Sequence, residues 1–92
     1  MSENACSRDG REFSTWGADR PVHARPSLSS AVVTTLPGPR RVFIDCQVRG
    51  DTVRAEGYEN DWWAHLRDQG GYLSNIYVND PASHLPGVPD CP

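Results

Sequence analysis

Aromatic side chains and carboxylates are concentrated in the stretch from residue 58 to residue 77. The aromatic residues are Tyr58, Trp62, Trp63, Tyr72 and Tyr77, with Glu56, Glu59, Asp61 and Asp68 close by in sequence. An aromatic ring offers a flat apolar surface, and its face attracts cations. Such a group suits a ligand that carries an apolar or sugar face together with an ammonium group. The alternative interpretation is that all five rings form the core and rim of the fold.

Catalytic and metal-binding chemistry is not expected from this sequence. His23, His65 and His84 are scattered, none at the close spacing of a zinc motif, and no Cys-x-x-Cys occurs. A cysteine nucleophile needs a positioned base and a third group. Asp61 and Asp68 lie across a surface strand and a turn, where nothing raises the pKa of a carboxyl group. We therefore predict a protein that is not an enzyme, with no catalytic residues, no metal site and no cofactor.

The three cysteines are Cys6, Cys46 and Cys91. An odd number suggests one disulfide and one remaining thiol. Cys46 and Cys91 are the expected pair, because Cys46 lies in a strand and Cys91 in a Pro-rich tail that needs an anchor. Closing that loop would contribute about 4 kcal/mol in the chain-entropy model. The alternative is a set of reduced, partly buried thiols.

Charge and hydropathy restrict the class of partner. The formal net charge is -3, so a phosphate backbone or an anionic membrane surface is a poor partner. No segment is apolar enough to insert into a membrane. A disulfide favours an extracellular or cell-wall-associated protein, although residues 1–10 lack the features of a signal peptide. A cytoplasmic protein or a component of a larger assembly is the alternative.

The elements that must position the aromatic and acidic residues of segment 58–77 are expected to be short. The chain has 92 residues with eight Gly and eight Pro, which favours a single all-β domain with many turns. We expect a flexible N-terminal arm over residues 1–20, a β-barrel over 21–78 and a Pro-rich tail over 79–92. The expected strands are 22–25, 32–36, 41–48, 52–55, 62–66 and 72–74, and residues 75–78 are expected to form one helical turn.

The segment 41–48 shows the clearest strand pattern. Val42, Ile44, Cys46 and Val48 alternate with Phe43, Asp45 and Gln47, which predicts that the first set lies on one face of a half-buried strand. Gly50-Asp51 predicts a tight hairpin before the return strand. Residues 56–61 are expected to form an acidic loop.

Six segments in register resemble the bacterial SH3 (SH3b) domains, especially the small Cys-containing type of actinobacterial proteins. They are VHARPS (22–27), LPG followed by VFI (36–38 and 42–44), CQVRG (46–50), WAHL (63–66), GYLSNIYV (71–78) and LPGVPDC (85–91). The first segment departs from the family pattern, since it lacks the Gly of Ser-Gly-Pro and has Ala24 in place of Val. The resemblance covers residues 20–91.

The resemblance implies a small SH3-like barrel of five to six short strands that recognises peptidoglycan or a short peptide. It also supports the pairing of Cys46 with Cys91. In the family pattern Trp63 shares its register with Leu66, which places Trp63 in the core and leaves Trp62 exposed. The candidate ligand-binding residues are therefore Tyr58, Asp61, Trp62, Tyr72 and Tyr77.

Two other classes of function fit the sequence. A structural or assembly subunit would grip neighbouring proteins with its arm and tail, burying Phe13 and Trp16. A small inhibitor would act through protein–protein contacts made by the acidic segment 56–61. In all three hypotheses the partner is a peptide, peptidoglycan or another protein.

Overall fold

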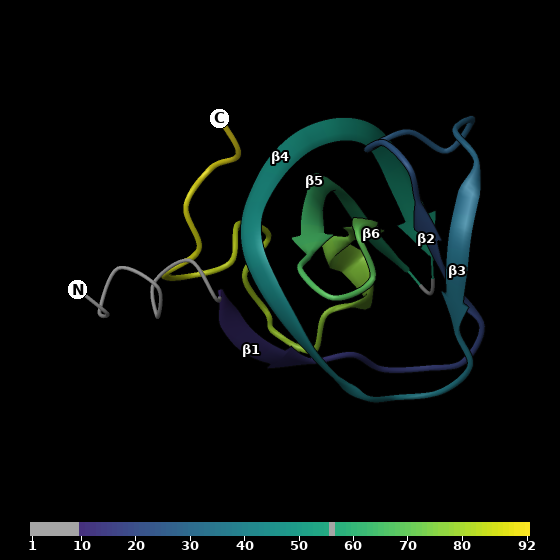
Figure 1. The fold of residues 1–92 in the computed structure, drawn as a ribbon, viewed down its shortest axis with the longest axis horizontal. Coiled ribbons are helices and arrows are strands. Elements are labelled where there is room, and N and C mark those ends of the chain that lie inside the picture. The colour runs from purple at the N-terminus through teal and green to yellow at the C-terminus, as the bar shows by residue number, and fades with distance from the viewer. Residues whose placement is uncertain (1–9, 56) are drawn as a thin grey trace.

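The computed structural model describes residues 10–55 and 57–92, which form one antiparallel sheet. Its strands are β1 (Arg11–Ser14), β2 (Arg20–His23), β3 (Val32–Leu36), β4 (Arg41–Ala55), β5 (Tyr58–Leu66) and β6 (Gly71–Ser74), followed by the short 3-10 helix η1 (Asn75–Tyr77). Their order in the sheet is β1-β4-β5-β6-β2-β3. The sheet curls into a half-barrel, and the long strand β4 curves around β5 and β6 (Figure 1). The all-β prediction is therefore confirmed for the described residues.

Strand β4 continues where the sequence predicted a hairpin. The prediction of a reversal at Gly50-Asp51 is wrong, because β4 extends to Ala55 and its residues 53–55 still pair with β5. Between Arg49 and Val53 the register shifts, as in a β-bulge, which bends a strand without reversing it. A Cβ at Gly50 would lie 2.0 Å from the carbonyl oxygen of Pro26. This glycine therefore permits a close approach of two backbones.

A second irregularity in β4 changes which side chains face the core. Val42 and Ile44 are buried as predicted. The register shifts between Ile44 and Cys46, because the chain advances by two residues on β4 and by only one residue on β5. Beyond this bulge the alternation is inverted. Gln47 is fully buried, whereas Cys46 and Val48 are only partly buried. The prediction that Cys46 and Val48 share the buried face is therefore wrong.

Two predicted loops are strands. The predicted arm 1–20 includes β1, which pairs with β4 through Phe13 opposite Val42 and packs Phe13 on the core. Residues 1–9 lie outside the described residues. The predicted acidic loop 56–61 is also wrong from Tyr58 onward, because this segment is the first half of β5 and pairs with the extended end of β4. Glu56 is likewise outside the described residues.

Other predicted elements are confirmed. Strand β3 has the predicted bounds, the predicted strand 72–74 lies within β6, and η1 lies within the helical turn predicted at 75–78. Strand β2 begins two residues earlier than predicted and ends at His23. Among the described residues no helix is long and apolar enough to cross a membrane.

The core extends from the sheet to the C-terminal tail. The larger cluster joins buried side chains of β2 to β6 with Val78, Leu85 and Val88. A smaller cluster forms around Trp63, which is 1% exposed, together with Val53 and Ile76. Trp63 is thus a core residue, as predicted. Leu85 and Val88 bring the tail into the core, although its prolines exclude a continuous strand.

The tail is also attached covalently. The disulfide between Cys46 of β4 and Cys91 confirms the predicted pair, with an S–S distance of 2.02 Å. Hydrogen bonds flank it, since Gln47 N donates to Pro89 O and Cys91 N donates to Gln47 O. The tail is therefore fixed beside β4 by both kinds of bond.

Candidate ligand-binding groove

A groove of about 490 Å³ lies between the start of β5 and the segment 79–83. Its buried floor consists of Asn75, Ile76 and Val78. Its walls are formed by Trp16, Tyr58, Glu59, Asn60 and residues 79–83. We refer to this feature as the groove.

Trp16 is the aromatic residue most firmly held in the wall of the groove. Its indole Nε1 donates a hydrogen bond to Ile76 O at 3.0 Å, and its backbone N donates to Tyr77 O at 3.1 Å. The indole ring meets the rings of Tyr58 and Tyr77 edge to face, each at 6.3 Å between centroids. These contacts join β5 and η1 to the segment that follows β1.

Arg20 stabilises the back of this aromatic wall. Its guanidinium lies 4.5 Å from the centroid of Trp16 and 4.3 Å from that of Tyr77, within the range of a cation–π contact. Arg20 Nε also donates to Trp16 O at 2.8 Å. This arrangement requires glycine at position 17, where φ is +77° and a Cβ would overlap the Arg20 guanidinium. The wall is therefore preorganised by the turn between β1 and β2.

Asn75 leaves an unused acceptor at the floor of the groove. Its Nδ2 donates to Gln47 Oε1 and to Ser83 O, both at 3.1 Å, so the orientation of the amide is determined by two acceptors. Its Oδ1 is buried and has no hydrogen-bond partner within the described part of the chain. A buried acceptor without a donor costs about 1–3 kcal/mol.

Two carboxylates give the groove a negative rim. Glu59 lies on the β5 side and pairs with Arg54 at 3.3 Å, an exposed contact that water screens strongly. Asp80 lies on the opposite side, where its Oδ1 accepts a hydrogen bond from Ala82 N at 2.9 Å. Asn60 bridges the two sides through Nδ2, which donates to Ser83 O at 3.2 Å. The rim is therefore suited to a positively charged group.

The structure separates the five predicted ligand-binding residues. Tyr58 lines the groove and is 63% exposed, and Tyr77 packs against Trp16 behind the wall. Asp61, Trp62 and Tyr72 do not line the groove. Three groove residues were not predicted from the sequence, namely Trp16, Asn75 and Asp80. An isolated Trp followed by Gly in an otherwise polar stretch was the only signal for Trp16.

Trp62 belongs to a different surface. Its ring meets that of His84 edge to face at 4.5 Å, and the guanidinium of Arg49 lies 5.3 Å from its centroid. His84 Nε2 in turn lies 3.0 Å from Asp90 Oδ1. Trp62 is only partly exposed as a result, and its contacts attach the tail to β5.

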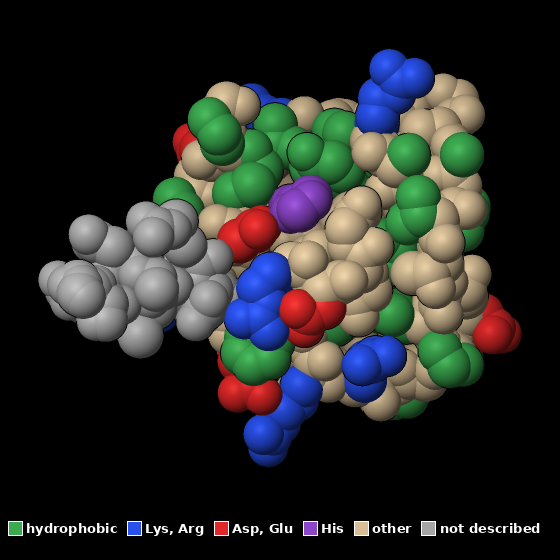
Figure 2. Space-filling view, in the orientation of Figure 1, with side chains coloured by type: hydrophobic (Ala, Val, Ile, Leu, Met, Phe, Trp, Pro, Cys, Tyr) green, Lys and Arg blue, Asp and Glu red, His purple; other side chains and the backbone are tan. Residues whose placement is uncertain are grey.

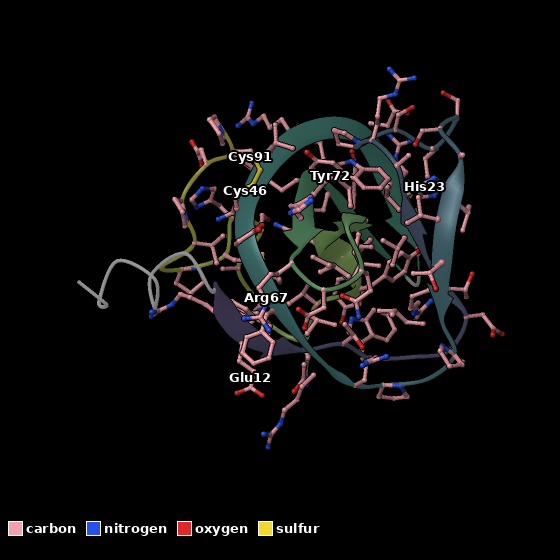
Figure 3. The ribbon with its side chains drawn as sticks, in the orientation of Figure 1. Glu12, His23, Cys46, Arg67, Tyr72 and Cys91 are labelled. Atoms are coloured by element: carbon pink, nitrogen blue, oxygen red, sulfur yellow. A yellow bond between two sulfur atoms is a disulfide. The ribbon has the colours of Figure 1, made fainter. Side chains whose placement is uncertain are left out.

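Tyr72 lies beside a second polar group that the sequence analysis also missed. His65 Nδ1 is 2.7 Å from Asp45 Oδ1, and the His65 ring is 5.0 Å from the Tyr72 ring. Figure 3 shows Tyr72 on the same side of the molecule as Cys46 and Cys91. On this face a histidine lies next to an acidic side chain, with hydrophobic side chains gathered beside them (Figure 2). Asp45 lies at the bulge in β4, between Ile44, which is opposite Leu66, and Cys46, which is opposite His65.

The groove offers aromatic surfaces, carboxylates and amide groups for contact with a ligand, and none of its lining residues is a histidine or a cysteine. No protein-family model matches the sequence, and no curated protein matches it.

Proposed function

We propose that this chain is a non-catalytic SH3b-type module, and that its groove binds a short peptide with a free ammonium group, such as a peptidoglycan stem peptide. The curled antiparallel sheet supports the finer assignment to an SH3-like barrel. The segments that resemble the family form its central parts, since GYLSNIYV comprises β6 and η1 and WAHL ends β5. The proposal also favours an extracellular or wall-associated protein.

The observation that carries the proposal is the combination of groups in the groove. Trp16 and Tyr58 provide aromatic surface, while Glu59 and Asp80 provide negative charge on opposite sides. An ammonium group is attracted both by ring faces and by carboxylates. The two carboxylates fit a small cationic peptide better than a nucleic acid or an anionic lipid.

Co-sedimentation with purified peptidoglycan tests the proposal, with competition by a soluble stem peptide. Tyr58→Ala is the variant of choice, because the side chain is 63% exposed and its removal leaves the core intact. We expect about a tenfold loss of retention, the usual effect of removing an aromatic contact residue. Trp62→Ala is the matched control and should be retained like the unmodified protein. Equal retention of both variants, or none of the unmodified protein, would contradict the proposal.

A further inference from the structure

The disulfide lies beside two side chains that are also metal ligands. One ligand atom each from Asp45, Cys46 and His65 lies within 4.8 Å of the other two. Cys91 Sγ is bonded to Cys46 Sγ and is therefore adjacent to the same group. In the oxidised protein both sulfurs are committed to each other, and neither is available as a thiolate.

Breaking the disulfide would not separate the two cysteines. The backbone of Gln47, the residue after Cys46, accepts from Cys91 N at 2.8 Å and donates to Pro89 O at 2.9 Å. The Gln47 side chain donates from Nε2 to Leu85 O and to Val88 O, both at 2.9 Å. These bonds hold the tail against β4 independently of the sulfurs. Reduction would therefore leave two thiols side by side.

The group is open to solvent and has the right chemistry for one metal ion. The side chains of His65 and Asp45 are 28% and 29% exposed, and both cysteines are partly exposed. Thiolate and imidazole are the preferred ligands of Zn²⁺, with carboxylate oxygen as a common additional ligand. Zinc–ligand distances of about 2.0–2.3 Å place neighbouring ligand atoms roughly 3.3–3.8 Å apart in a tetrahedron. Small side-chain rotations from the present positions reach that spacing.

We propose that reduction of the Cys46–Cys91 disulfide converts this group into a Zn²⁺ site formed by Cys46, Cys91, His65 and Asp45. A dithiol reductant gives two electrons and two protons to the disulfide and is itself oxidised to a disulfide, leaving two cysteine thiols. Zn²⁺ then replaces both thiol protons, which pass to solvent. His65 binds as the neutral imidazole and Asp45 as the carboxylate. The site is separate from the groove, so the inference goes beyond the proposed function and does not depend on it.

Metal titration of the full chain tests the inference. All proteins carry Cys6→Ser, so that the third cysteine contributes no thiol. The protein is reduced with a phosphine, which water converts to the phosphine oxide while the disulfide gains two hydrogens. Zn²⁺ is added in competition with a colorimetric chelator, and Co²⁺ is added separately as a spectroscopic probe. We expect one metal ion per reduced chain, thiolate-to-cobalt charge-transfer absorption and the d–d bands of a tetrahedral site.

Variants and the oxidised protein provide the controls. The oxidised protein should bind at least about 100-fold more weakly, because it offers no thiolate. Cys91→Ser should abolish the two-thiolate spectrum, and His65→Gln should weaken Zn²⁺ binding by about 10–100-fold, with His84→Gln as a neutral comparison. If reduction unfolds the chain, Zn²⁺ should restore the near-UV circular dichroism of the oxidised form. No uptake after reduction, equal affinity in the oxidised protein, no effect of His65→Gln, or a reduced unfolded chain that Zn²⁺ fails to refold would each overturn the inference.

Discussion

The side chain of Gln47 and the backbone of Leu85 form a closed pair of hydrogen bonds. Gln47 Nε2 donates to Leu85 O, and Leu85 N donates to Gln47 Oε1, both at 2.9 Å. The same amide also donates to Val88 O and accepts from Asn75 Nδ2. Gln47 therefore uses all the donors and acceptors of its side chain, and connects β4 to the tail and to the floor of the groove.

Replacement of Gln47 should strongly destabilise the protein. Gln47→Met keeps the volume of the side chain. It leaves four groups without the hydrogen-bond partner that the Gln47 amide provides, namely Leu85 N–H, Leu85 O, Val88 O and Asn75 Nδ2. We expect a loss of about 3 kcal/mol or more in the free energy of unfolding, because each unsatisfied buried group costs about 1–3 kcal/mol. Chemical denaturation provides the measurement. Thr52→Ala, an exposed change on the same strand, should alter the free energy of unfolding by less than about 0.5 kcal/mol. Similar values for both variants would show that the network contributes little.

The contrast between Gln47 and its neighbours shows what sequence patterns can and cannot predict. Alternation correctly placed Val42 and Ile44 in the core, because it reports a regular strand. It failed at Gln47, since one bulge inverts every following position and no residue type marks it. Gly50 carried a turn signal, but the same residue type also serves close backbone packing.

The site was less predictable than the fold for a related reason. Tyr58 was found because it lies in an aromatic stretch of sequence. Trp16 reaches the groove only through its contacts with η1, about sixty residues later in the chain. Local patterns cannot report such a contact. The disulfide was predictable because Cys46 lies in a strand and Cys91 lies in a Pro-rich tail that needs an anchor, and the resemblance to SH3b domains supports the same pair.

Loss of the disulfide should lower stability without changing the fold. The bond closes a loop with a sequence separation of 45, so Cys46→Ser with Cys91→Ser should lower the free energy of unfolding by about 4 kcal/mol in the chain-entropy model. Denaturation of the double variant in the Cys6→Ser background measures this change. Native near-UV circular dichroism should persist, since Gln47 still holds the tail. A change below about 1 kcal/mol would contradict the expectation.

Gly17 should be a sensitive position for the aromatic wall. Gly17→Ala introduces a side chain where φ is +77° and where the Arg20 guanidinium already lies. We expect a loss of about 1–2 kcal/mol in thermal or chemical unfolding, together with weaker peptide binding. Gly38→Ala is the control, because a Cβ there meets nothing within 4 Å. If the two variants are equally stable, Arg20 does not hold the wall as described.

Trp62 should matter for stability and not for binding. Trp62→Ala removes the ring contact with His84 and should cost about 1 kcal/mol of stability. Because Trp62 does not line the groove, the dissociation constant for a stem peptide should change by less than about twofold. Calorimetric titration against the unmodified protein measures this. A tenfold weaker affinity would show that the peptide binds at the Trp62–His84 face and not in the groove.

Titration of the isotope-labelled protein with a soluble peptidoglycan stem peptide tests the central claim most directly. Amide-proton and nitrogen correlation spectra resolve the indole N–H of Trp16 and the side-chain amides of Asn60 and Asn75, which all lie at the groove. We predict saturable shifts of these signals, while the indole N–H of Trp62 stays in place. Shifts confined to Trp62 and the surface around His84, or no shifts at millimolar peptide, would contradict the assignment of the groove as the binding site.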